Sequence, residues 1–212
     1  MIKLLQIMVT IMNDEFLNKF KDTSIYEELK KIEEIYLDLE KKQDIFCNTF
    51  NVHCKKGCGT CCEHFIPDVY SIEARYLAYG IIKEGKAEAV RKRINEWSEE
   101  SAYCPLYDFD SNFHCTVYKY RPLVCRLFGA TASKNKDGLP CFRKCKYNKE
   151  GIDLSPGDLN KNKDAVICMS DYAMMLKEFS QEENEKDLLP VALVKELDKL
   201  SFLLDLLNQN DQ

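Results

Sequence analysis

Residues 54–62 read CKKGCGTCC, which places four thiols within nine positions. Gly57 and Gly59 interrupt the run, and a short glycine-bearing loop can wrap its backbone around an ion. Spacers of two or three residues let neighbouring thiolates converge on one centre, as in zinc knuckles and ferredoxin-type clusters. Adjacent cysteines such as Cys61 and Cys62 point to different sides of an extended or helical chain. They therefore suit two neighbouring centres, or one ligand beside a supporting thiol.

A second group of cysteines lies between Tyr103 and Cys145, where prolines and polar turns replace helical periodicity. Its members are Cys104, Cys115, Cys125, Cys141 and Cys145. The two groups together supply enough thiols for two four-thiolate sites, which carry net negative charge. Arg121 and Arg126 flank Cys125 and are placed to offset that charge and to donate hydrogen bonds to sulfur. Surface ion pairs are the alternative role for these arginines.

The remaining candidate ligands have plainer explanations. Cys145 lies within ligand reach of Cys141 and is either a ligand or a free thiol. Cys47 and Cys168 lie in helical, apolar surroundings and are expected to pack in the core. The histidines lie within two positions of a motif cysteine, but thiols already suffice, so we expect supporting or solvent-exposed roles for His53, His64 and His114.

Composition favours metal over disulfides as the reason for eleven cysteines. The chain has 212 residues, 45% hydrophobic and 31% charged, which can bury a core without covalent links. Residues 4–12 are apolar, but no small-residue cleavage site follows, so they indicate a helix start and not a signal peptide. No stretch reaches the roughly 18 to 20 apolar residues of a membrane helix. We therefore expect a cytoplasmic protein.

The net charge of −5 bears on the partners of the chain. It provides no basic field to attract nucleic acid or an anionic membrane. The expected partner is a metal ion or cluster, and a protein partner remains open.

The sequence around the cysteines predicts a mainly α fold, with amphipathic helices around an irregular cysteine-rich metal-binding centre and a small β-hairpin. Helical spacing predicts one long or broken helix over 13–50, helices over 71–85 and 86–100, and closing helices over 165–179 and from Pro190 through Leu207. Ser155-Pro156-Gly157-Asp158 is typical of a helix start. The run 114–118 has strand composition and predicts the hairpin.

Three segments follow from this pattern. We expect an N-terminal helical segment over 1–50, a cysteine-cluster metal-binding domain over 51–148, and C-terminal helices over 149–212 that pack on the same core. The leucines of the last helix are expected to pack inside rather than form a dimer zipper.

The cysteine pattern resembles a known family. The order CxxxCxxCC, then CPL, then CTVYKYRPLVCRLF and a later cysteine resembles the YkgJ-type cysteine-cluster family, whose domain is described as zinc- or iron-chelating. The resemblance covers about residues 50–145 and implies eight metal ligands: Cys54, Cys58, Cys61, Cys62, Cys104, Cys115, Cys125 and Cys141. The family pattern has two residues between its first two cysteines, whereas three separate Cys54 and Cys58. The cluster is more distantly similar to that of flagellin lysine methylases.

The leading function is therefore binding of zinc or an iron-sulfur cluster, by a site that organises the fold and stores, senses or transfers metal or electrons. The alternative is an iron-sulfur-dependent redox or methyl-transfer enzyme resembling the flagellin lysine methylases. Its CxxxCxxC triplet is similar to that of radical SAM enzymes, but Thr60 replaces their aromatic residue and no glycine-rich nucleotide loop is present. Thiol-disulfide catalysis ranks last, because Cys61 and Cys62 are adjacent and no CxxC begins a helix of a βαβ unit.

Overall fold

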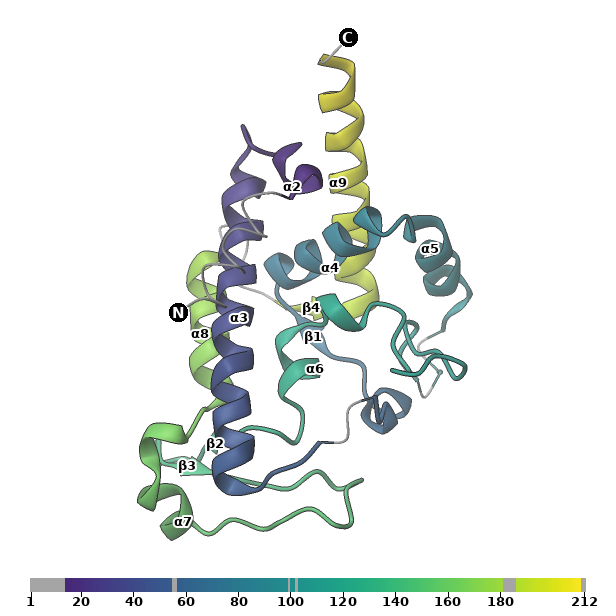
Figure 1. Cartoon of the computed structure of the whole chain (residues 1–212). Coiled ribbons are helices and arrows are strands. Elements are labelled where there is room, and N and C mark those ends of the chain that lie inside the picture. The colour runs from purple at the N-terminus through teal and green to yellow at the C-terminus, as the bar shows by residue number, and fades with distance from the viewer. Residues whose placement is uncertain (1–13, 55–56, 99, 102, 181–185, 211–212) are drawn as a thin grey trace.

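The computed structural model describes residues 14–54, 57–98, 100–101, 103–180 and 186–210 (Figure 1). These residues form a mainly helical fold with two small antiparallel sheets, which confirms the predicted fold class. No described helix is both long enough and apolar enough to cross a membrane. The apolar residues 4–12 lie outside the described part of the chain.

The helix predicted over 13–50 is broken into α2 (Glu15–Asn18) and α3 (Ser24–Phe50). Asp14 caps α2, since its carboxylate accepts hydrogen bonds from the amides of Phe16 and Leu17. The long helix α3 buries one face at helical spacing, and Asn51 ends it in the left-handed conformation. The cysteine loop therefore follows directly after the end of the long helix α3.

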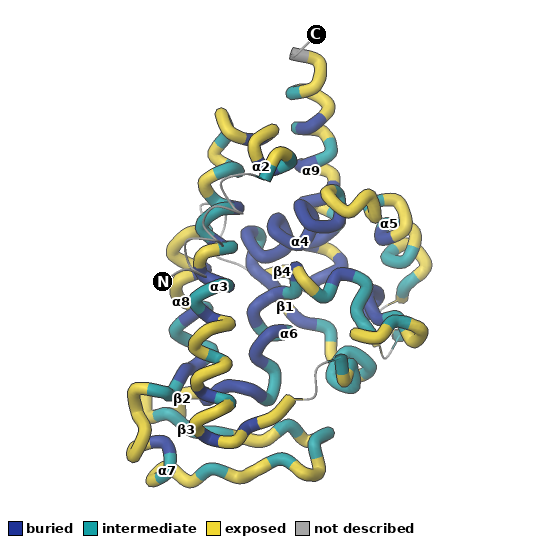
Figure 2. Tube along the Cα trace, viewed as in Figure 1, coloured by how far each residue is buried: buried dark blue, intermediate teal, exposed yellow. Residues whose placement is uncertain are grey.

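Helix α4 (Ser71–Lys83) is the central element of the core and is buried along most of its length (Figure 2). It packs mainly against α9 (Leu189–Asn210), and α5 (Ala87–Glu96) follows it across a short turn. Leu193, Leu197 and Leu200 of α9 are fully buried against this core. The expectation that the leucine stripe packs inside is confirmed.

A buried ion network joins three helices. Arg75 on α4 donates from Nε to Glu196 on α9 at 2.7 Å and from Nη1 to Glu28 on α3. The side chains of Arg75 and Glu196 are 6% and 3% exposed. A buried charge without its partner costs several kcal/mol, so the network fixes how these helices meet.

The shorter helices are α6 (Leu123–Leu127), α7 (Pro156–Lys161) and α8 (Met169–Phe179), with 3-10 turns η1 (Thr60–Glu63), η2 (Tyr118–Tyr120) and η3 (Lys163–Ala165). The predicted start of α7 is confirmed, because Ser155 and Asp158 exchange capping hydrogen bonds and Pro156 is the first helical residue. Helix α8 begins later than predicted, at Met169, since residues 163–165 form η3 instead.

The two sheets are β1 (Asp68–Val69) with β4 (Asp187–Leu188), and the hairpin of β2 (Ser133–Lys134) with β3 (Pro140–Cys141). The hairpin therefore lies at 133–141, and its predicted place at 114–118 is wrong. His114 has a left-handed backbone (φ 48°), and Cys115 forms only an isolated bridge to Tyr107. The run 114–118 therefore forms one β-bridge and no strand, and the chain then enters η2.

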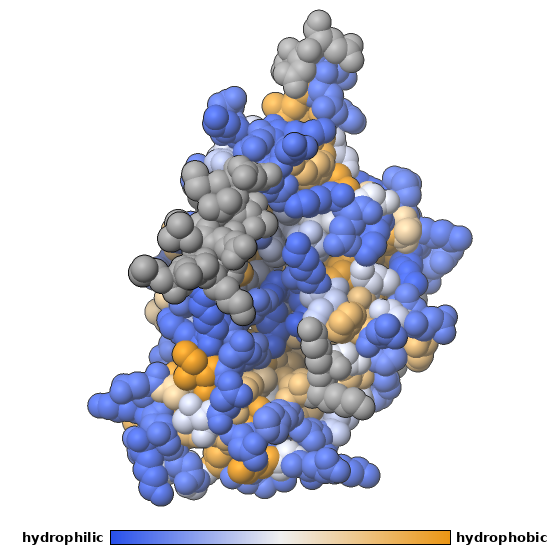
Figure 3. Space-filling model, viewed as in Figure 1, coloured by the Kyte–Doolittle hydropathy of each residue, from blue (hydrophilic) through white to orange (hydrophobic). Residues whose placement is uncertain are grey.

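The long helices lie beside the loop segments that carry most of the cysteines. Figure 1 shows α3, α4, α8 and α9 as a helical frame, with η1 and the turns around residues 104–118 grouped beside its lower part. The face seen in Figure 3 is mostly hydrophilic, with smaller hydrophobic areas between. The frame thus provides a rigid support for segments that have little regular structure of their own.

Candidate metal centre

The loop after α3 carries the first cysteines and is held by a tight turn at η1. The Cys62 amide donates to the Gly59 carbonyl at 2.8 Å, and the His64 amide donates to the Cys61 carbonyl at 3.2 Å. This turn brings the sulfurs of Cys61 and Cys62 to 4.0 Å from each other. The two adjacent side chains therefore do reach a common point, which the sequence pattern alone did not indicate.

Two glycines let this loop lie directly against residues 112–114. Gly57 and Gly59 both have left-handed backbones, with φ of 76° and 68°. A Cβ on Gly57 would lie 2.5 Å from the Asn112 carbonyl oxygen, and one on Gly59 would lie 2.4 Å from the His114 Cβ. Only glycine fits at both positions, and the contact places the CxxxCxxCC loop beside Cys115.

Backbone hydrogen bonds join the two cysteine groups. The Cys104 amide donates to the Cys62 carbonyl at 2.8 Å. The Cys104 carbonyl in turn accepts a hydrogen bond from the Tyr107 amide at 2.9 Å. Tyr107 also forms the bridge to Cys115, and its hydroxyl donates to Glu63 at 2.8 Å. Hydrogen bonds between backbone segments therefore hold cysteines that are far apart in the sequence close to one another.

Cys125 lies on α6, and the two arginines that flank it point to different neighbours. Arg121 stacks on Tyr118, with its guanidinium carbon 3.5 Å from the ring centre, and donates to the Tyr118 and Cys125 carbonyls. Its positive charge acts to lower the pKa of four thiols, those of Cys54, Cys61, Cys115 and Cys125. The charge of Arg121 therefore acts on thiols of both cysteine groups.

Arg126, the residue after Cys125 on α6, is buried. Its guanidinium donates to Glu40 at 2.6 Å and to the carbonyls of Arg121 and Lys119 at 2.7 Å each, and it lies over the Tyr36 ring. These contacts tie η2 and α6 to α3. The structure therefore places Arg126 in the support of the centre rather than against sulfur.

The structure places Cys145 near Cys54, whereas Cys141 lies near Cys168. A Cβ on Gly129 would lie 2.7 Å from the Cys145 Cβ, so the Cys145 segment packs on the chain just after α6. Asn148 donates to the His53 carbonyl at 2.8 Å, and the charge of Cys145 acts on the pKa of Cys54. Sequence reasoning missed Asn148, because nothing local distinguishes an asparagine that bonds 95 positions away.

Cys141 lies on β3 at the far end of this segment (Figure 1). Its sulfur is 3.3 Å from the Ser133 hydroxyl, and its charge acts on Cys168. Cys168 is buried at the start of α8, as expected of a packing residue, and Cys47 packs against the core from the end of α3.

The model of the CxxCxxCC family, described as "Putative zinc- or iron-chelating domain", matches residues 53–168. The chain belongs to this family. The match confirms the resemblance and its undecided metal, zinc or iron. Comparisons with curated proteins and with solved structures give no match.

Burial disfavours the thiolate form of several cysteines of this CxxCxxCC domain. Burial raises the pKa of Cys104 to about 12 and raises the pKa of Cys115 and Cys125, and the charges of neighbouring thiols add to the increase. The exception is Cys61, whose pKa is lowered to about 7 by a hydrogen bond from Cys62, whereas the pKa of Cys62 is raised. Several thiolates in this volume would repel one another, and a bound cation would offset that repulsion.

The donor set of the domain fits zinc or iron, since both accept tetrahedral sulfur. Zinc-sulfur bonds of about 2.3 Å place two thiolates of one tetrahedron about 3.8 Å apart, close to the 4.0 Å between Cys61 and Cys62. Among the described residues, no three His, Cys, Asp or Glu side chains lie close enough to hold one ion. Binding to one ion would therefore draw the other thiols closer than the structure places them.

The histidines of the domain have other contacts. His53 Nε2 lies 2.7 Å from the Asn51 side-chain oxygen, and His114 Nδ1 lies 3.2 Å from the Asp108 carbonyl oxygen. His64 stacks on Tyr147, with 5.4 Å between ring centres. These contacts agree with the supporting roles expected from the sequence.

Proposed function

We propose that this CxxCxxCC domain binds zinc through cysteine thiolates drawn from three segments of the chain. The proposed ligands are Cys54, Cys58, Cys61, Cys62, Cys104, Cys115, Cys125 and Cys145, enough for two four-thiolate sites. One observation supports the assignment above all others. The hydrogen bond between Cys104 and Cys62 and the glycine contacts with residues 112–114 bring separate cysteine segments together, with no disulfide among the described residues.

The separation of the Cys61 and Cys62 sulfurs favours a single ion over a four-iron cluster. In such a cluster each cysteine binds a different iron, so adjacent sulfurs must diverge. The 4.0 Å separation instead suits two ligands of one tetrahedral ion. An iron-sulfur cluster is the second candidate, and the metal analysis below separates the two.

The chain's own residues have distinct roles in this proposal. Arg121 offsets the negative charge of the thiolates and orders the turn before Cys125. Arg126 anchors that turn to α3 through Glu40. Ligands of this kind must stay reduced, so we expect the protein to work in a reducing compartment such as the cytoplasm.

Metal content tests the proposal directly. The protein is purified under anaerobic conditions, its metals are measured by mass spectrometry, and its visible spectrum is recorded. We expect a colourless protein with one or two zinc ions per chain. Cys61→Ser and Cys62→Ser should each lower the zinc content, whereas Cys47→Ser, which changes a core-packing thiol at the end of α3, should leave it unchanged.

A second pair of variants tests the eighth ligand. Cys145→Ser should lower the zinc content, and Cys141→Ser should not. If the protein is brown and contains iron and sulfide, the site holds an iron-sulfur cluster and not zinc. A folded, reduced protein without stoichiometric transition metal would overturn the proposal.

A further inference from the structure

The proposed zinc ligands differ in their exposure to solvent. Cys104 is 6% exposed and belongs to the hydrophobic core, and Cys62 and Cys115 pack against that core. By contrast, Cys54 and Cys58 are exposed, in the loop that follows α3. A metal ion held by exposed thiols can be reached from solvent, whereas one held at the core is reached only after the core opens locally.

Four thiols form an inner group, namely Cys62, Cys104, Cys115 and Cys125. The hydrogen bond from the Cys104 amide to the Cys62 carbonyl, at 2.8 Å, joins two of the chain segments that carry them. The negative charges of Cys104 and Cys125 act to raise the pKa of Cys62. Those of Cys104 and Cys115 act to raise the pKa of Cys125. The four thiols of the inner group therefore lie near one another.

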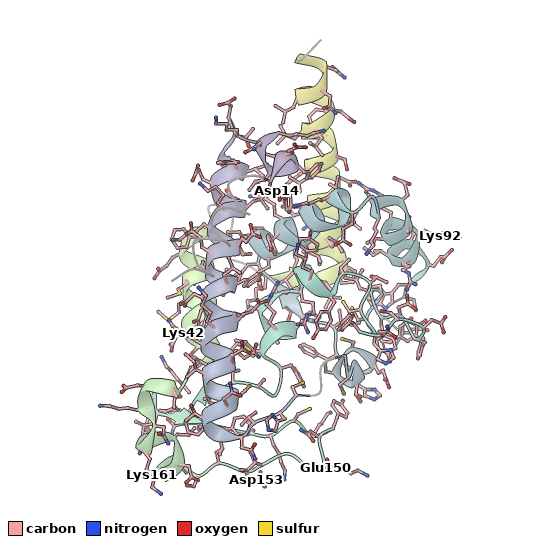
Figure 4. All side chains as sticks on the ribbon, viewed as in Figure 1. Asp14, Lys42, Lys92, Glu150, Asp153 and Lys161 are labelled. Carbon is pink, nitrogen blue, oxygen red and sulfur yellow. The ribbon has the colours of Figure 1, made fainter. Side chains whose placement is uncertain are left out.

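Three thiols form an outer group, namely Cys54, Cys58 and Cys145. The charges of Cys58 and Cys145 act to raise the pKa of Cys54, so the three lie near one another. Cys145 is half-buried and lies on the segment between β3 and α7, which runs along the lower edge of the molecule, where Figure 4 labels Asp153. Lys144 donates to Asp153 at 2.8 Å, and the Asp153 side chain is 79% exposed. The outer group therefore combines two exposed thiols with a third on a surface segment.

Cys61 lies between the two groups. Its charge acts to raise the pKa of Cys54 in the outer group and of Cys104 in the inner group. Its sulfur is 4.0 Å from that of Cys62. Cys61 can therefore complete the ligands of either group. The outer group by itself fills three of the four positions of a tetrahedral zinc ion, so an outside thiolate has to displace at most one protein ligand.

We propose that this domain passes the zinc ion of its outer group to the thiol of an acceptor molecule, while the zinc ion of the inner group stays bound. The inference rests on the proposed zinc function. The acceptor thiol loses its proton and its sulfur forms a bond to zinc, as a bond between zinc and a protein sulfur breaks. The released protein thiolate takes up a proton. Repetition of this step transfers the ion, and no electrons move.

The kinetics of zinc release test the inference. The zinc-loaded, full-length protein is mixed under anaerobic conditions with an excess of the coloured zinc chelator 4-(2-pyridylazo)resorcinol, at increasing concentrations of reduced glutathione as the thiol probe. We expect two phases of about one zinc ion each. The fast phase should accelerate in proportion to the glutathione concentration. The slow phase should be about tenfold slower or more and should not respond to glutathione, because it requires local opening of the core.

Two variants assign the phases, and a matched variant is the control. Cys58→Ser, at an exposed position, should remove the fast phase and leave the slow one. Cys125→Ser should remove the slow phase, and circular dichroism verifies that it is folded. If this variant does not fold, the result for Cys58→Ser decides. Cys47→Ser also replaces one thiol but should keep both phases, because Cys47 packs against the core at the end of α3.

A single phase, whether it releases one zinc ion or two, would overturn the inference and leave the zinc function in place. A fast phase that persists in Cys58→Ser, or one that does not respond to glutathione, would overturn it as well. A folded, reduced protein without zinc would refute the zinc function itself, and the metal analysis identifies that case before any release is measured.

Discussion

Asp14 is a single residue that serves two helices at once. Its carboxylate caps α2 and also accepts hydrogen bonds from the Tyr79 hydroxyl, at 2.6 Å, and from the Lys83 ammonium, both on α4. Burial acts to raise its pKa, but the hydrogen bonds from Lys83 and Tyr79 outweigh burial and lower the pKa below 3.8. Asp14→Asn keeps a capping side chain and loses the ion pair. We expect it to lower the free energy of unfolding by about 1 kcal/mol at pH 7.

The sign of the pH dependence of this residue follows from the lowered pKa. The stabilisation is present above the unfolded pKa and is lost as the pH falls through the folded value. Urea unfolding of the unchanged protein and of Asp14→Asn should therefore give different free energies of unfolding at neutral pH. This difference should disappear below pH 3.8. Asp22→Asn, at an exposed position, is the control. A difference in the free energy of unfolding that stays constant with pH would contradict the role given to the Asp14 carboxylate.

At the scale of elements, the glycines of the CxxxCxxCC loop determine whether the loop can meet residues 112–114. Gly57→Ala is strained by its φ of 76° and also by the Asn112 carbonyl, which its Cβ would approach to 2.5 Å. Gly138 is a matched control, since its φ is 77° and nothing lies within 4 Å of an added Cβ. Both variants carry the backbone penalty of about 1 kcal/mol. Only Gly57→Ala should also lower the metal content.

Measurements of zinc content and urea unfolding on the two glycine variants separate these effects. Equal metal loss in both would mean that backbone strain, and not the contact with residue 112, decides the result. Unchanged metal in Gly57→Ala would show that the loop can bind without this contact.

Elements with local signals could be predicted from the sequence, and those that depend on distant contacts could not. Ser155, Pro156 and Asp158 determine the start of α7 within four residues, so the prediction was correct. The run 114–118 has strand composition, but its partners lie in the loop at 104–107 and no ladder forms. Likewise the proposal of Cys145 in place of Cys141 as a ligand rests on contacts with Gly129 and His53, which spacing does not reveal.

On the scale of the whole molecule, the helical frame and the cysteine segments should respond differently to metal removal. The frame has its own core, in which α4, α9 and the buried face of α3 pack together. The described parts of 53–67 and 103–148 contain only short elements, and we expect these segments to depend on bound metal for their order. Treatment with a strong chelator should raise hydrogen exchange in these segments and leave α3, α4 and α9 protected. If chelation leaves hydrogen exchange in these segments unchanged, a structural metal is ruled out.

The bond of Arg75 to Glu196 has a consequence for how the protein is made. Glu196 belongs to α9, so the ion pair that joins α4 to α9 cannot form during synthesis until α9 has left the ribosome. The thiols from Cys54 to Cys145 emerge earlier, and a nascent chain presents them to metal and to oxidants before their support exists. Protection of these thiols in the newborn protein must therefore come from the metal itself or from the surroundings.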